Sequence, residues 1–196
     1  MTNRREFLKI GLAAAAWPGV TAADASPLHE VAEAPSLYKA IYDKAYDSAR
    51  EFAAEMRRRG VVVHAIDQDI TSVWFHDLAL RWRRGPAAIA GLTAPTALFC
   101  LEQLAWDHRM RVVLQIDHRP GRNGAVEHEI RAPQAIWRRA EASLRERQDW
   151  GAATAELACC RPGPTSVARG RIIATHGAQV QDLPLVSWVI APIDRT

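Results

Sequence analysis

Two carboxylates and a hydroxyl directly follow a short apolar run in the first half of the chain. Residues 61–66 are mostly apolar and rich in β-branched side chains, which predicts a buried strand, and Asp67, Asp69 and Thr71 come immediately after it. Side chains of these types can hold a small ligand or take part in acid–base chemistry. The plainer alternative is that Asp69 caps a helix predicted for residues 69–84 and that Asp67 is a solvated loop residue.

The spacing D-x-D-x-T after an apolar strand resembles the nucleophile motif of the haloacid dehalogenase superfamily of phosphatases. The resemblance implies that Asp67 is the nucleophile, Asp69 the general acid and base, and Thr93 the phosphate-binding hydroxyl. The chain departs from that pattern, because no lysine follows Lys44 and because Asp117 and its neighbour match the later magnesium-binding acidic pair poorly. A phosphatase-like hydrolase is therefore the alternative function.

Two further predicted strands, residues 87–91 and 111–117, also end in residues that could contact a ligand. Ligands bind beyond the carboxyl ends of the strands of an open parallel sheet, where helix N-termini favour an anion. We therefore expect these residues to form one polar, ligand-binding edge of the sheet. The alternative is that they are only helix caps and solvated loop residues. The catalytic candidates are Asp67, Asp69, Thr93 and Asp117. The ligand-binding candidates are Thr71, Gly91, Thr93, His118 and Arg119.

Two histidines are candidate metal ligands. Residues 112–118 and 126–130 alternate in a way that places His118 and His128 on the same face of a hairpin. If residues 118 and 126 are partners, the imidazoles are diagonal neighbours, close enough to share an ion. The alternative is a pair of structural histidines at the rim of the core. No catalytic triad signature, P-loop or G-x-G-x-x-G turn is present, so the sequence names no cofactor.

The three cysteines do not form a disulfide framework. Cys100 lies in an apolar helical stretch and is expected to be buried. Cys159 and Cys160 are adjacent, and a disulfide between sequence neighbours needs a strained ring. No second pair or nearby histidine gives a zinc-binding spacing. Whether this pair is reduced, bonded or metal-bound stays open at this point.

The elements that position these residues follow from hydrophobic periodicity. Helices are predicted for residues 36–59, 69–84, 93–108 and 134–150, with Ser36 and Thr93 as caps. The helix over 93–108 is apolar nearly all round and is expected to be buried. The first helix carries a stripe of tyrosines, Tyr38, Tyr42 and Tyr46, which suits the rim of the core or a partner surface.

Helices that alternate with strands predict an α/β fold. Strands follow at 61–66, 87–91 and 111–117, then at 125–131, 171–175 and 185–190, with 125–131 antiparallel to its predecessor. We expect a single domain over residues 36–196 with a small, mostly parallel mixed sheet flanked by helices. Residues 26–35 are expected to be a flexible segment before it.

The N-terminus resembles a twin-arginine signal peptide. Its residues are Arg4, Arg5, Phe7, Leu8 and Lys9, preceded by Asn3 where Ser or Thr is usual. A weakly apolar run at 10–20 and a small-x-small site before a cut between Ala25 and Ser26 complete the pattern. The run is too short for a permanent membrane anchor. The resemblance implies recognition by the twin-arginine export machinery and transport, already folded, to the periplasm.

Charge and composition narrow the function. The whole chain has a net charge of +3. The leader holds more basic than acidic residues, so the chain without it is nearly neutral. This balance argues against nucleic acid and anionic membranes as partners. Folded export without a complete catalytic constellation favours a non-catalytic protein that binds a periplasmic partner or a ligand. An accessory subunit of a periplasmic redox enzyme is one version of this expectation.

Overall fold

Helices and strands alternate through the part of the chain that the structure describes. The structure, a computed structural model, describes residues 37–122, 125–160, 167–175 and 184–192, all within one compact unit. The strands are β1 (Lys39–Asp43), β2 (Val63–Ile66), β3 (Ile89–Thr93), β4 (Met110–Pro120), β5 (Ala125–Pro133), β6 (Val167–Thr175) and β7 (Leu185–Pro192). The helices are α1 (Asp47–Arg58), α2 (Thr71–Val73), the π-helical turn η1 (Trp74–Leu78), α3 (Ala79–Arg84), α4 (Pro95–Trp106), α5 (Gln134–Glu146) and α6 (Trp150–Ala158). The expected leader, the segment at 26–35 and the cap Ser36 lie outside these residues.

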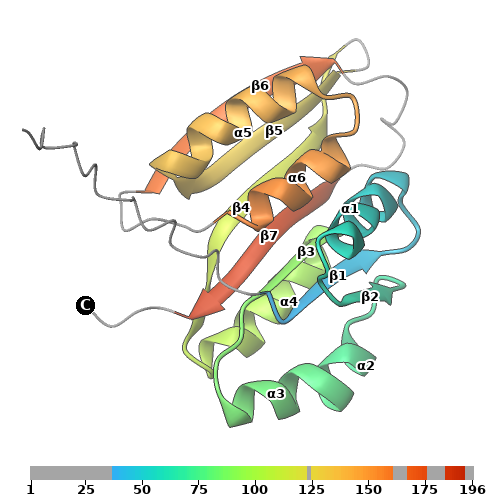
Figure 1. Cartoon of the computed structure of the whole chain (residues 1–196), viewed down its shortest axis with the longest axis vertical. Helices are drawn as coiled ribbons and strands as arrows, with labels where there is room; N and C mark the ends of the chain where they lie inside the picture. Colours follow the sequence, from blue (N-terminus) through green and yellow to red (C-terminus); the bar gives the residue numbers. More distant parts are fainter. Residues whose placement is uncertain (1–36, 123–124, 161–166, 176–183, 193–196) are drawn as a thin grey trace, which may run out of the picture. The chain divides into compact units, whose positions relative to one another are not determined.

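The strands form one sheet in the order β2-β1-β3-β7-β4-β5-β6 (Figure 1). β1 is parallel to both β2 and β3, whereas the other four pairings are antiparallel. The α/β class is confirmed, but the expectation of a mostly parallel sheet is corrected. β7 inserts between β3 and β4, which still run in the same direction. The carboxyl ends of β1, β2, β3 and β4 therefore share one edge.

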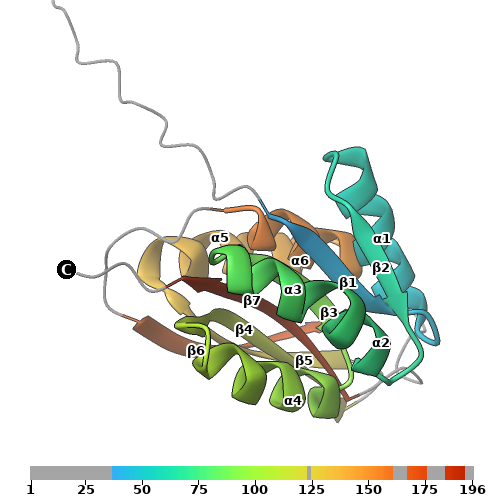
Figure 2. The same ribbon diagram turned by 90° about the horizontal axis from the view of Figure 1, so that it is seen from below.

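Helices cover both faces of the sheet and enclose two cores. Figure 2 shows α5 and α6 on one face and α4 on the other. The first core lies among α1, α5, α6 and the sheet, and its largest buried side chains include Phe52 and Trp150. The second lies between the sheet and the helices from α2 to α4, around Trp82, Leu101 and Trp188. Each face is thus built from apolar residues of alternating strand positions.

The helix predicted for residues 36–59 is wrong in its first half. Residues 39–43 form β1, and the helix begins only at Asp47. β1 pairs on both sides and buries Ala40 and Ile41 in opposite cores, so long-range pairing overrides a helix-like local spacing. The tyrosine stripe is consequently not one helix face, because Tyr38 and Tyr42 belong to the strand region and Tyr46 precedes α1.

The remaining strands agree with the prediction, whereas several helix details do not. The expected helix at 134–150 ends at Glu146, and α6 follows as a separate helix that the sequence interpretation missed. α4 is not buried all round, since Phe99 and Trp106 are 63% and 49% exposed. Cys100 is exposed as well, contrary to expectation. Among the described helices, none is long and apolar enough to cross a membrane.

Candidate functional site

A pocket of about 350 Å³ opens at the carboxyl edge of the sheet, between α4 and the segment that follows β2. Its lining comprises Gln68, Asp69, Ile70, Thr71, Trp74, Phe75, Thr96, Ala97, Cys100 and Leu104. Aliphatic and aromatic side chains form most of the wall, and the polar side chains belong to the loop after β2 and to the N-terminal ends of α2 and α4. The edge predicted to bind a ligand therefore does carry a pocket, built around two of its eight candidate positions, Asp69 and Thr71.

Local sequence explains the shape of the loop after β2. Gln68 adopts a φ of 59°, a left-handed conformation that a non-glycine residue adopts at some cost. This turn lets Asp69 accept a hydrogen bond from the backbone N–H of Thr71 at 2.8 Å, at the start of the helical segment. A hydrogen bond with the Thr71 side chain, together with this backbone hydrogen bond, holds the pKa of Asp69 below its usual range. The N-cap of α2 is Ile70, without a side-chain cap, so Asp69 closes the turn that precedes the helix and is not its N-cap as the plainer alternative expected.

The other carboxylate of the D-x-D-x-T motif points elsewhere. Asp67 is exposed and forms an ion pair with Lys44 at 3.2 Å. It is not among the residues that line the pocket, and neither are Thr93 and Asp117. The catalytic candidates of the phosphatase interpretation therefore do not surround one described cavity.

Thr93 ends β3 as a fully buried residue. Its hydroxyl accepts a hydrogen bond from the Trp188 indole N–H and donates one to the carbonyl of Ala94, both at 3.1 Å. Ala94, without a side-chain cap, precedes α4, so the expectation that Thr93 caps this helix is wrong. Gly91 lies under the same indole, and a Cβ there would overlap Trp188. Both residues seat a core tryptophan and do not reach the pocket.

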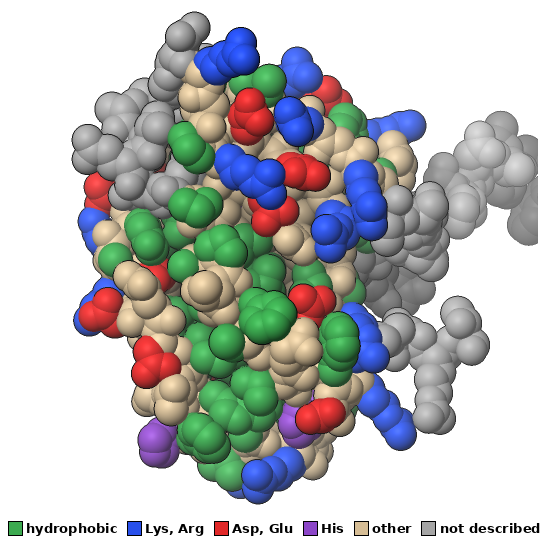
Figure 3. Space-filling view, turned by 180° about the vertical axis from the view of Figure 1, so that it is seen from behind, with side chains coloured by type: hydrophobic (Ala, Val, Ile, Leu, Met, Phe, Trp, Pro, Cys, Tyr) green, Lys and Arg blue, Asp and Glu red, His purple; other side chains and the backbone are tan. Residues whose placement is uncertain are grey.

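Asp117 and Arg119 lie within β4 on the face of the sheet opposite α6. Their neighbour His118 points towards α6, so strand alternation turns both residues to the opposite face. There Asp117 accepts hydrogen bonds from Gln115, and Arg119 lies 3.7 Å from Glu129 of β5. Figure 3 shows charged side chains over this upper part of the rear face and hydrophobic ones over its lower part.

His118 and His128 are directly paired in the β4–β5 ladder, so the predicted shared face is confirmed, with a register closer than the expected diagonal. Their Nδ1 atoms lie 2.7 Å apart, and Nε2 of His118 lies 2.7 Å from the Ser187 hydroxyl. Both rings are fully buried, and the ring centroids of Trp150 and His118 lie 4.3 Å apart. Among the described residues, no group of three or more His, Cys, Asp or Glu side chains could hold a metal. The two imidazoles and the Ser187 hydroxyl therefore form a buried hydrogen-bonded network.

Asp43 is a buried carboxylate that sequence reasoning missed. It ends β1, the strand between β2 and β3, and is fully buried. Oδ1 accepts the N–H of Ala45 at 3.1 Å, whereas Oδ2 has no hydrogen-bond partner among the described residues. Burial raises the pKa of Asp43, and hydrogen bonds from the backbone of Ala45 and Gln68 offset this only in part. The strand that carries Asp43 was read as helix, which hid its position at the edge.

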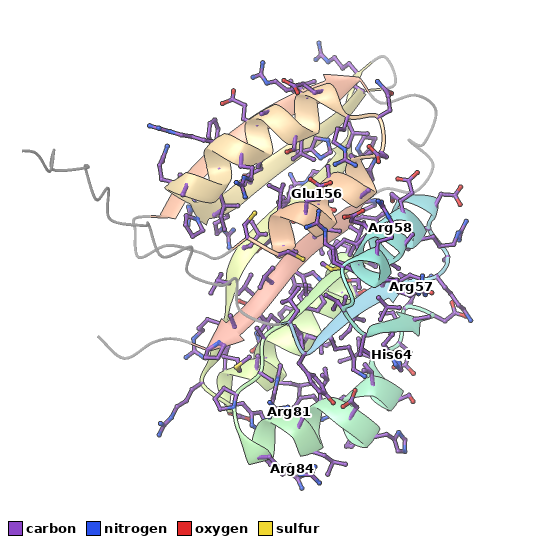
Figure 4. The ribbon with its side chains drawn as sticks, viewed as in Figure 1. Arg57, Arg58, His64, Arg81, Arg84 and Glu156 are labelled. Carbon is purple, nitrogen blue, oxygen red and sulfur yellow. The ribbon has the colours of Figure 1, made fainter. Side chains whose placement is uncertain are left out.

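A second polar cluster ties the opposite end of β1 to η1. Asp77 accepts the Tyr38 hydroxyl at 2.5 Å and lies 2.5 Å from the Lys39 ammonium. The hydrogen bond to Asp77 raises the pKa of Tyr38, and burial together with Lys39 lowers that of His64. Figure 4 shows His64 on β2, with Arg81 and Arg84 on α3. The cluster fixes the helical segment against the sheet and thereby holds the wall of the pocket.

The adjacent cysteines are both free thiols. Cys159 lies 3.8 Å from the Met56 sulfur, and burial raises the pKa of its thiol. Cys160 contacts the Arg139 guanidinium at 3.0 Å. A raised thiol pKa lowers the thiolate fraction, so the geometry of Cys159 is that of a packing residue.

The fold and the pocket define an α/β protein with a mostly apolar cavity at the carboxyl edge of a mixed sheet. The chain matches no protein-family model, no curated protein and no solved structure. Its function must therefore be argued from the chemistry of its own residues.

Proposed function

We propose that this chain is a small exported protein that binds a compact, mostly apolar molecule in the pocket between the β2–α2 loop and α4. One observation carries the proposal: a cavity of about 350 Å³ lies at the sheet edge where ligands bind in α/β folds. Aromatic and aliphatic side chains offer burial to an apolar body, and the loop residues offer a few polar contacts. Export through the twin-arginine route remains part of the proposal.

A periplasmic protein partner is the second candidate function, and a specific feature favours it. Large hydrophobic side chains stand exposed on η1, α3 and α4, namely Phe75, Leu80, Phe99 and Trp106. Figure 3 shows hydrophobic side chains gathered on the lower part of the rear face. Contiguous exposed apolar surface of this kind is typical of interaction sites. A partner that covers α4 would also cover the mouth of the pocket.

Binding to the pocket is testable with a neutral fluorescent probe, 1-aminoanthracene, whose emission rises in an apolar environment. We expect saturable binding with one site per chain. Cys100→Trp should weaken it by about ten-fold or more, since an indole at this exposed lining position would fill the cavity. Gln103→Trp is the matched control, because Gln103 is an exposed residue of the same helix outside the lining. Equal affinity of the parent and Cys100→Trp would contradict the proposal.

A further inference from the structure

The wall of the pocket carries a single formal charge, and it is negative. Of the ten lining residues, Asp69 alone is a carboxylate, and no Lys, Arg or His is among them. A ligand with an anionic group would meet this carboxylate without a compensating cation. The charge on the wall therefore disfavours anions and favours a positively charged group.

The carboxylate of Asp69 is held in place by Thr71. Oδ1 accepts the backbone N–H of Thr71 at 2.8 Å, and a hydrogen bond with the Thr71 side chain, together with this one, lowers the pKa of Asp69. None of the ion pairs among the described residues involves Asp69, whereas the nearby Asp67 is paired with Lys44. Asp69 is exposed, and its charge is therefore available to a cation that enters the pocket.

Two aromatic residues line the same cavity as this carboxylate. Trp74 is held by edge contacts with Trp82 and His108, each with ring centroids 5.9 Å apart. Phe75, the next residue, is 64% exposed and lines the same cavity. The faces of aromatic rings attract cations, and most strongly those of low hydration such as quaternary ammonium groups.

We propose that the ligand of this pocket is an organic cation, an ammonium group on a compact apolar body. The inference rests on the proposed function and adds the charge of the ligand to it. The apolar body would occupy the space bounded by Ile70, Ala97 and Leu104, and the ammonium would lie near Asp69. The aromatic wall accepts both parts of such a molecule.

The test compares two probes of the same shape, phenyltrimethylammonium and tert-butylbenzene, which differ in one nitrogen and its charge. Both are titrated against the intrinsic tryptophan fluorescence of the parent protein, of Asp69→Asn and of Asp67→Asn. We expect the parent to prefer the ammonium probe, and Asp69→Asn to weaken that probe by about five-fold or more while tert-butylbenzene changes by less than about two-fold. Asparagine keeps a side-chain oxygen that can accept the Thr71 N–H, so the loop is preserved.

Asp67→Asn is the matched control, because Asp67 carries the same charge, lies two residues before Asp69 and does not line the pocket. It should leave both affinities unchanged. An ammonium probe that binds no better than its neutral counterpart, or a loss of equal size in both variants, would overturn the inference and leave the proposed function intact. Binding of neither probe, together with a failure of 1-aminoanthracene to bind, would remove the proposed function itself.

Discussion

Asp43 and Asp69 lie at the same edge of the sheet, yet their surroundings act on them in opposite directions. Asp43 is fully buried with one oxygen unsatisfied, and its pKa is raised. Asp69 is exposed and accepts the Thr71 N–H, and its pKa is lowered. A buried carboxylate with an incomplete set of partners is destabilising when it is ionised, whereas hydrogen bonds to an exposed carboxylate stabilise its ionised form.

The two residues should therefore have opposite effects on the pH dependence of stability. A raised pKa means that the folded state holds the Asp43 proton more tightly, so its ionisation costs stability as the pH rises above the unfolded value of about 4. Relative to the parent, Asp43→Asn should become progressively more stable between about pH 3 and 6. Asp69→Asn should become progressively less stable over that range, because a lowered pKa contributes stability above the unfolded value. Urea denaturation across this range measures both, and parallel profiles for the two variants would contradict the assignment.

Asp67 provides a test of the phosphatase alternative at the scale of one residue. Its carboxylate is paired with Lys44 and lies outside the pocket lining, and no lysine follows in the sequence to complete the phosphatase pattern. We expect the parent to release no phosphate from p-nitrophenyl phosphate with magnesium above a protein-free blank. Turnover by the parent that Asp67→Asn abolishes, with an unchanged melting temperature, would establish the alternative.

At the scale of the element, α4 has one buried and one exposed apolar side. Leu101 is fully buried in the second core, whereas Phe99 is 63% exposed. Leu101→Ala should lower the free energy of unfolding by about 2–5 kcal/mol, the usual cost of a cavity at a buried leucine. Phe99→Ala, on the same helix, should change it by less than about 0.5 kcal/mol. Chemical denaturation measures both, and a similar effect at the two positions would mean that the helix is rotated from its described orientation.

The contact between α1 and α6 depends on the absence of a side chain at Gly151. A Cβ there would overlap the carbonyl of Ser48 and lie 3.1 Å from Cβ of Glu51. Figure 4 shows the charged rim of the same contact, with Arg58 on α1 and Glu156 on α6. Close helix packing therefore sets the residue type at this position.

Gly151→Ala should destabilise the protein by about 1–3 kcal/mol, because the two helices would have to move apart. Helix propensity alone predicts the opposite sign, since alanine is favoured over glycine in helices by about 1 kcal/mol. Ala142→Gly, at an exposed position of α5, calibrates the size of that propensity term in this protein. A gain of stability in Gly151→Ala, as measured by thermal unfolding, would refute the close approach.

At the scale of the whole molecule, the proposed export depends on the paired arginines at the N-terminus. Replacement of Arg4 and Arg5 by lysine should retain the protein in the cytoplasm, because the resemblance implies that the export receptor reads this pair. Replacement of Arg57 and Arg58, an adjacent pair exposed on α1, by lysine should leave export unchanged. Fractionation and immunoblotting of the two variants measure this, and normal export of the Arg4 and Arg5 variant would refute the leader assignment.

The sequence by itself determined the features that depend on local pattern. Alternation identified β4 and β5 and placed His118 and His128 on one face, because side-chain direction along a strand follows from its two-residue period. The helix predicted to begin near Asp69 is present from Thr71, because hydrophobic periodicity is a local pattern. The sequence also predicted that the carboxyl ends of β2, β3 and β4 lie at one edge, and these strands do run in the same direction.

The tertiary structure decided what depends on residues far apart in the chain. β1 became a strand because β2 and β3 hydrogen-bond it from both sides, and this pairing brought Asp43 to the edge of the sheet. β7 separated β3 from β4 and so changed the sheet from mostly parallel to mostly antiparallel. The exposed side of α4, and with it Cys100 and the pocket, followed from which helix face met the sheet. An all-apolar helix does not encode that choice locally, because the hydrophobic effect has no direction until a partner surface is in place.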